Sequence, residues 1–135
     1  MQARFLLDTN TLIYIRRNRP PSVLARFQRL ADGEATLSVI TFGKLAYGAA
    51  KSVRRGEAIA QLDALRRAIP IAGLPETAAD IYGAIRADLE GRGQQIGNND
   101  LWIAAHALAA NLTLVTNNEK EFARVKGLKI QNWTR

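Results

Sequence analysis

Short apolar runs of strand length alternate along the chain with longer segments whose apolar residues recur every three or four positions. Strands that alternate with helices in this way are typical of an α/β domain with a mainly parallel sheet. Five strands are expected, which fit one sheet: Arg4 to Asp8, Thr36 to Ile40, Ile69 to Ala72, Leu112 to Thr116, and Leu128 to Gln131.

The longer segments predict six helices. Ile59, Leu62 and Leu65 lie on one face of the segment Gly56 to Ala68, which is therefore amphipathic. The segment Asn99 to Ala110 is apolar almost all round and is expected to be buried. The other helices are Thr11 to Arg17, Ser22 to Ala31, Thr41 to Ser52, and Glu76 to Gly91. Because no repeat or linker divides the sequence, we expect one domain over residues 1–135.

The composition restricts the chemistry that the chain can perform. With no cysteine and one histidine, disulfide frameworks, thiol nucleophiles, iron–sulfur clusters and zinc sites of Cys or several His are excluded. Any bound metal must therefore have mainly oxygen ligands. The apolar segment near the N-terminus is interrupted at once by Asp8, so neither a signal peptide nor a membrane span is expected, and we expect a cytoplasmic protein.

The formal charge of +7 favours a polyanionic partner, of which nucleic acid is the most plausible. Two other interpretations stay open: an acidic partner protein, and a basic surface that simply faces solvent. For the basic residues Arg16, Arg17, Arg19, Lys51, Arg54 and Arg55, a solvated face is favoured over specific RNA contacts.

Polar residues gather where the predicted strands end. In open parallel sheets, ligands bind where the carboxyl ends of strands meet the following helices, so residues far apart in sequence share one edge. Four junctions carry such residues: Asp8 to Asn10, Thr41 to Lys44, Asn98 to Asp100, and Thr116 to Glu121.

Three of these junctions carry carboxylates. Asp8 and Asp100 taken singly could each serve a neighbouring helix as a cap or a dipole partner. Together with Glu121 they would repel one another unless a cation neutralised them, which indicates Mg²⁺ or Mn²⁺. The chemistry that follows is metal-assisted attack of water on a phosphodiester, with a carboxylate as general base.

Lys44 breaks the local rules of its segment. Thr41 is the predicted N-cap of its helix, and a Glu three residues later would complete a capping box. A lysine has no acceptor for that role, and its charge opposes the positive end of the helix dipole.

The motifs "LLDTNTLIYI", "SVITFGKLAYGA", "IRADLEGRGQQIGNNDLWIAAHAL" and "LTLVTNNEKEFARVKGLKIQNW" together resemble the PIN-domain ribonucleases of the VapC toxin type, from Arg4 to Trp133. The resemblance implies a three-layer α/β/α sandwich and a bacterial toxin endoribonuclease that uses Mg²⁺ or Mn²⁺ to cleave tRNA or rRNA. It also implies a VapB-type antitoxin as partner and a homodimer, with a possible higher assembly when the antitoxin is bound.

Residue by residue, the resemblance makes Asp8 the first metal ligand and Asp100 the second, with Glu121 at an acidic position that some members use. The other implied site residues are Asn117 and Asn118, which orient water or substrate, and Thr9, Asn10 and Thr41, which support the loops.

The family has a Glu where this chain has Lys44, while the flanking residues agree with the family. We therefore expect Lys44 to weaken or abolish activity, and its ammonium could take the place of the metal. The alternatives are a non-catalytic α/β module that binds RNA or a partner, and a metal-dependent DNA nuclease or phosphatase. His106 is expected to pack in the core rather than take part in catalysis, and Trp102 and Trp133 are expected to pack in the core or in a lid rather than stack on bases.

Overall fold

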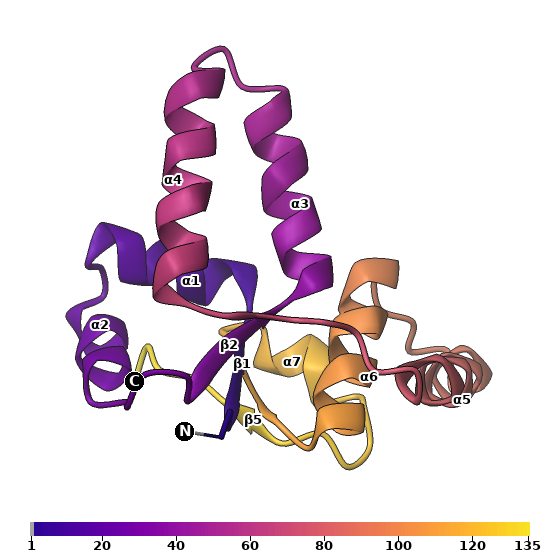
Figure 1. The fold of residues 1–135 in the computed structure, drawn as a ribbon. Helices are drawn as coiled ribbons and strands as arrows, with labels where there is room; N and C mark the ends of the chain where they lie inside the picture. Colours follow the sequence, from indigo (N-terminus) through magenta and orange to yellow (C-terminus); the bar gives the residue numbers. More distant parts are fainter. Residues whose placement is uncertain (1) are drawn as a thin grey trace.

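The computed structural model describes residues 2–135 and has one five-stranded sheet surrounded by helices (Figure 1). Its strand order is β3-β2-β1-β4-β5, and every neighbouring pair is parallel. All five predicted strands are present, although each is shorter than expected: β1 Phe5–Leu7, β2 Ala35–Ser38, β3 Ile71–Ala72, β4 Thr113–Val115 and β5 Ile130–Gln131.

The six predicted helices are also present: α1 Thr9–Arg17, α2 Pro21–Gln28, α3 Val39–Ala50, α4 Arg55–Ala68, α5 Ala78–Gly91 and α6 Asn98–Ala110. A further short helix, α7 Glu119–Phe122, was not predicted. It is a single turn, and one turn is too short to show helical periodicity in the sequence.

The sheet separates two hydrophobic cores, which confirms the predicted three-layer α/β/α arrangement. Successive residues of β1 point to opposite faces. Leu6 packs in a core with Leu89 of α5 and Phe122 of α7, whereas Phe5 and Leu7 pack in the other. This second core takes its helical residues from α1 to α4. Every strand of the sheet contributes residues to at least one of the two cores.

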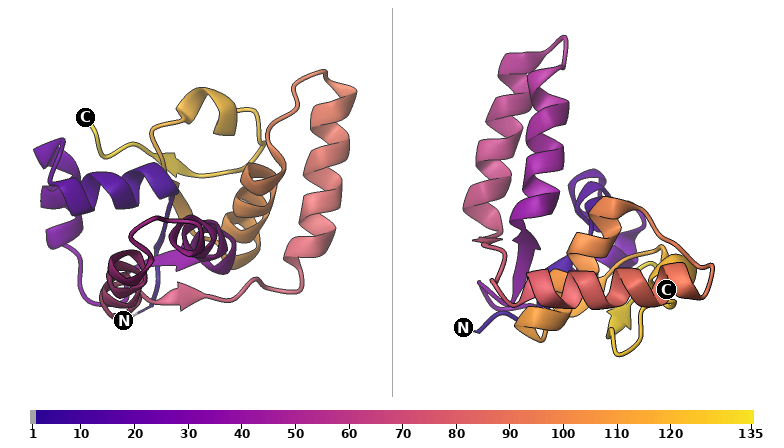
Figure 2. Two further views of the ribbon diagram at one scale, coloured as in Figure 1. Left: turned by 90° about the horizontal axis from the view of Figure 1, so that it is seen from above. Right: turned by 90° about the vertical axis from the view of Figure 1, so that its right-hand side faces the viewer.

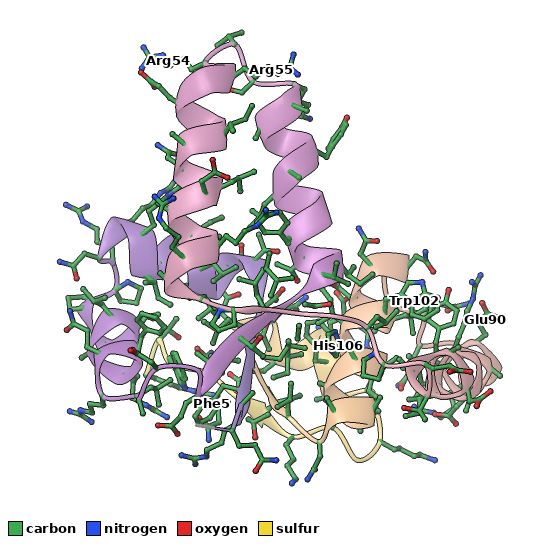
Figure 3. The ribbon with its side chains drawn as sticks, viewed as in Figure 1. Phe5, Arg54, Arg55, Glu90, Trp102 and His106 are labelled. Atoms are coloured by element: carbon green, nitrogen blue, oxygen red, sulfur yellow. The ribbon has the colours of Figure 1, made fainter. Side chains whose placement is uncertain are left out.

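Helices α3 and α4 form a hairpin that projects from the sheet (Figure 1); we call it the arm. The right-hand view of Figure 2 shows it standing clear of the remaining helices. No residue of α4 is fully buried. Arg54 and Arg55 lie at the tip of the arm (Figure 3).

The prediction that Thr41 caps α3 is wrong. The hydroxyl of Ser38 accepts a hydrogen bond from the Ile40 amide at 3.1 Å and so caps the helix. The helix therefore starts at Val39, which places Lys44 in its second turn, beyond the reach of a capping box. Strand β2 ends early for the same reason, because the Ser38 cap converts the backbone to helix at once.

Among residues 2–135, no helix has the length and apolar character needed to cross a membrane.

Candidate active site

Asp8 follows β1 at the carboxyl edge of the sheet, and its carboxylate is held from two sides. Its Oδ1 accepts a hydrogen bond from the Thr9 amide at 2.8 Å, and its Oδ2 accepts one from the Thr116 hydroxyl at 2.8 Å. The residue is the N-cap of α1 and is buried. Asp8 thus has the capping role that the sequence allowed, and the same contacts fix its carboxylate at the edge.

Thr116 links the β4 junction to Asp8, a role that the sequence analysis missed. Its hydroxyl donates to Asp8 and accepts the amide hydrogen of Asn118 at 3.0 Å. The Asn118 side-chain amide in turn donates to Oε2 of Glu121 at 3.0 Å. Thr116 could have been identified from the sequence, because it is a hydroxyl residue at the end of a central strand. Two other polar junctions lie beside that strand end.

Asp100 and Glu121 lie within hydrogen-bond reach of each other, although α6 and α7 carry them separately. Burial, the hydrogen bond to Glu121 and the negative charges of Glu121 and Asp8 together raise the pKa of Asp100 to about 7. The same hydrogen bond, with those from Asn118 and the Gly97 amide, lowers the pKa of Glu121. Below about pH 7 the carboxyl of Asp100 is therefore mainly protonated, and Glu121 is the ionised partner.

This proton predicts a pH dependence of stability. The folded-state pKa of Asp100 lies above its ordinary value of 3.8. The stability that the protonated carboxyl contributes is therefore fully present below its ordinary pKa of 3.8 and is lost as the pH rises through about 7. In EDTA, we expect the free energy of unfolding in urea to fall more steeply between about pH 5 and about pH 8 in the unmodified chain than in Asp100→Asn.

The control for this measurement is Asp88→Asn. Arg92 lowers the pKa of Asp88, so that carboxylate stays ionised throughout the range and its removal leaves the slope unchanged. Equal slopes for Asp100→Asn and the unmodified chain would contradict the assignment of the proton to Asp100.

Three buried oxygen atoms at this edge have no hydrogen-bond partner: Thr9 Oγ1, Thr41 Oγ1 and Glu121 Oε1. Buried polar atoms are rarely left unpaired, so oxygen acceptors without partners beside mutually repelling carboxylates fit a hydrated hard cation. The part of the chain that the structure describes has no group of three or more His, Cys, Asp or Glu side chains able to hold a metal ion. The donor set fits Mg²⁺ only as an ion held by one or two carboxylates and several waters.

Lys44 is exposed on α3, where its positive charge lowers the pKa of Asp100 and so opposes the neighbouring carboxylates. Among the ion pairs of residues 2–135, none involves Lys44. The expectation that its ammonium might replace the metal between Asp8 and Asp100 is therefore wrong for this structure. The long side chain lies within electrostatic range of the carboxylates but stays in solvent, because an ammonium is strongly hydrated.

The remaining predicted residues connect the loops around Asp8. Asn10 donates a hydrogen bond to Asn117 at 3.2 Å, and Asn117 donates to the Tyr14 hydroxyl at 2.7 Å. These contacts join α1 to the loop after β4. They are exposed, so they leave the amides accessible from solvent.

The aromatic candidates lie away from the carboxylates. His106 is buried on α6 (Figure 3), and its Nδ1 is 2.8 Å from the Ser38 hydroxyl. Trp133 is buried edge-to-face against Phe5, with the ring centroids 5.5 Å apart. The predictions that both residues pack in the core are confirmed. Trp102 is half-buried and stacks on Tyr82 instead.

The model of the PIN domain family matches residues 5–128, which include all four junctions of the site. The chain belongs to this family. It is 38% identical to ribonuclease VapC2 of Rickettsia felis over 130 residues, which cover 96% of this chain and 97% of that protein. It is also 38% identical to the tRNA(fMet)-specific endonuclease VapC of Shigella flexneri over 131 residues, covering 97% and 98% of the two chains.

The fold agrees with these relatives. The structure of VapBC-1 from nontypeable Haemophilus influenzae superposes with a TM-score of 0.89 at 36% identity and covers 100% of both chains. The protein is therefore a PIN-domain ribonuclease of the VapC toxin type, from a toxin–antitoxin system.

Proposed function

We propose that this toxin is an endoribonuclease whose site is formed by Asp8, Asp100 and Glu121, and that Lys44 weakens or abolishes its activity. The observation that carries the proposal is that carboxylates from three separate junctions act on one another at one sheet edge, where Glu121 and Asp8 raise the pKa of Asp100. Acidic groups that repel one another in this way take up a cation readily, because a cation relieves the repulsion.

Asp8 and Asp100 are the proposed ligands of Mg²⁺ or Mn²⁺, which when bound activates the attacking water and neutralises charge on the phosphate. Asp8 is oriented for this role by the Thr9 amide and the Thr116 hydroxyl. Glu121 is the proposed general base, because it is an ionised carboxylate whose buried Oε1 has no hydrogen-bond partner. Asn118 holds Glu121 in place through Oε2.

RNA is the proposed substrate, and tRNA is the favoured class because the Shigella flexneri relative is named for tRNA(fMet). The formal charge of +7 suits a polyanion.

The test is an assay of Lys44→Glu against total tRNA, rRNA, single-stranded DNA and a phosphomonoester, with Mg²⁺ or Mn²⁺. The proposal is supported if Lys44→Glu cleaves RNA and the double variant with Asp8→Asn does not. Cleavage by the double variant would contradict it.

A non-catalytic RNA-binding module is the second candidate, favoured by the positive charge of the exposed Lys44 beside the carboxylates. RNA binding by such a module depends on salt but not on divalent ions. A Lys44→Glu variant that binds RNA without cutting it, and whose affinity is unaffected by EDTA, would favour this candidate.

The proposed partner is a VapB-type antitoxin. A groove of about 620 Å³ runs between α1 and the arm, and its lining is mostly apolar: Leu12, Ile15, Phe27, Leu45, Leu62 and Leu65. The arm is otherwise poorly covered, since no residue of α4 is fully buried. An apolar groove of this kind suits an amphipathic helix of a partner.

We also propose that the toxin is a homodimer, which light scattering of the purified chain tests.

Leu62→Glu is expected to weaken binding of the cognate antitoxin by about 30-fold, because a charge in the groove must be desolvated. The matched control is Ile59→Glu, on the same helix but outside the groove lining and 42% exposed. Isothermal titration of each variant with the antitoxin measures the difference. Equal affinities for the two variants would place the antitoxin elsewhere.

A further inference from the structure

A second, more polar cleft of about 530 Å³ lies between α5 and the start of α6. It is lined by Tyr82, Arg86 and Glu90 of α5, by Gln95 and Ile96 of the connecting loop, and by Asn98, Leu89 and Leu101. Figure 3 shows Glu90 and Trp102 on this side of the molecule, away from the arm. Its volume lies in the range of small-ligand sites.

The walls of the cleft combine an aromatic ring with hydrogen-bonding groups. Tyr82 stacks on Trp102 with ring centroids 3.9 Å apart and an angle of 13° between the planes. The Tyr82 hydroxyl also hydrogen-bonds Asn98 and accepts a hydrogen bond from Arg86 Nη1 at 2.8 Å. These contacts fix the Tyr82 side chain and hold the Arg86 guanidinium beside it.

Arg86 and Glu90 place a donor next to an acceptor. Arg86 Nε donates to Glu90 Oε2 at 3.0 Å, and both side chains are about half exposed. Within residues 2–135, Arg86 Nη2 and Glu90 Oε1 form no hydrogen bond to other protein groups. The edge of a nucleobase also presents a hydrogen-bond donor next to an acceptor, so it can pair with Arg86 and Glu90. Proteins recognise single-stranded RNA through hydrogen bonds of this kind to base edges, together with stacking on aromatic side chains.

The cleft shares a wall with the carboxylate site. Gln95 and Asn98 line the cleft, while Gly97, between them in the chain, lies next to the Asp100 carboxylate: a Cβ at Gly97 would be 3.8 Å from Asp100 Oδ2. Asp100 lies two residues beyond Asn98 in the same helical turn. A nucleotide whose phosphate lies at the carboxylates therefore has this cleft within reach of a neighbouring base.

We propose that this cleft binds an unpaired nucleobase of the RNA, next to the phosphodiester that is cut. Arg86 and Glu90 contact the base edge, Gln95 and Asn98 supply further polar contacts, and Tyr82 forms the aromatic wall. The proposal rests on the proposed function for its substrate, and it makes Arg86 and Glu90 specificity-determining residues.

The first experiment measures base binding without catalysis. Trp102 stacks on the cleft wall and Trp133 is buried elsewhere, so Trp102 fluorescence reports on the cleft. The unmodified chain is titrated in EDTA with each ribonucleoside 5′-monophosphate and with ribose 5-phosphate. We expect saturable quenching by at least one nucleotide, no response to ribose 5-phosphate, and loss of the signal in Trp102→Phe.

The variants locate the base. Arg86→Ala is expected to raise the Kd of the nucleotide by about tenfold, since a hydrogen bond to a charged group is lost. Arg67→Ala, which makes the same charge change on α4 of the arm, is expected to leave the Kd unchanged. Equal weakening by Arg86→Ala and Arg67→Ala, or quenching by ribose 5-phosphate, would each overturn the proposal.

The second experiment tests specificity in the Lys44→Glu background. Arg86→Ala is expected to change which sites are cut in a mixed-sequence RNA, whereas Arg67→Ala is expected to leave the pattern unchanged. An unchanged pattern in Arg86→Ala would overturn the role in specificity. If no version of the protein cuts RNA, the proposed function fails, while the fluorescence titration still decides whether the cleft binds a base.

Discussion

Replacing Lys44 with glutamate is expected to raise the rate of RNA cleavage in Mg²⁺ or Mn²⁺ by about 100-fold or more. The substitution changes the charge beside the carboxylates by two units, and solvent screening at the exposed position limits its effect to about 3 kcal/mol. A difference of that size corresponds to about two orders of magnitude in rate or metal occupancy. The direction follows from the position of Lys44, whose charge already acts on Asp100.

The matched control is Lys51→Glu, because Lys51 is the C-cap of the same helix and carries the same charge, but lies two turns farther from the sheet. It is expected to leave cleavage unchanged. The measurement is the initial rate on a labelled tRNA at a fixed concentration of divalent ion. Equal rates for the unmodified chain and Lys44→Glu would contradict the proposal that Lys44 weakens the site, and an equal gain in Lys51→Glu would attribute the effect to net charge.

Trp133→Ala is expected to destabilise the fold by about 3–5 kcal/mol, the usual cost of removing a large aromatic side chain from a core. Trp133 is 2% exposed and packs edge-to-face on Phe5 of β1. Its carbonyl accepts a hydrogen bond from the Ser22 hydroxyl of α2 at 2.9 Å. The end of the chain is therefore part of the core beneath α1 and α2 rather than a free tail.

The comparison for this prediction is Trp102→Ala, the same change at a half-buried position. It is expected to cost clearly less, because the stacking contact with Tyr82 is open to solvent on one side. Urea unfolding followed by circular dichroism gives both values. A smaller loss in Trp133→Ala than in Trp102→Ala would contradict the assignment of Trp133 to the core.

The sequence predicted the strands well because their apolar runs are buried on both faces of the sheet, and such runs are visible without neighbours. It also predicted that Asp8 and Asp100 lie at one edge, because parallel strands bring their carboxyl ends together. The prediction for Thr41 was wrong by three residues. Both Ser38 and Thr41 are suitable caps, and only the backbone path after β2 decides between them.

The tertiary structure alone decided the contacts between side chains. The raised pKa of Asp100 depends on Glu121 of the short helix α7, whose single turn has no sequence signature. Lys44 could be recognised as anomalous from its flanking motif, but its position in solvent could not. The cleft beside α5 needs Tyr82, Arg86 and Asn98 at distances that only the packing of α5 on α6 sets.

The sequence by itself determined the order of elements, the family and the junctions that carry chemistry, because local patterns of polarity encode them. Only the tertiary structure decided which atoms face one another at those junctions. Hydrogen bonds and charge interactions act over a few ångströms, and such distances between residues far apart in the chain are fixed by packing.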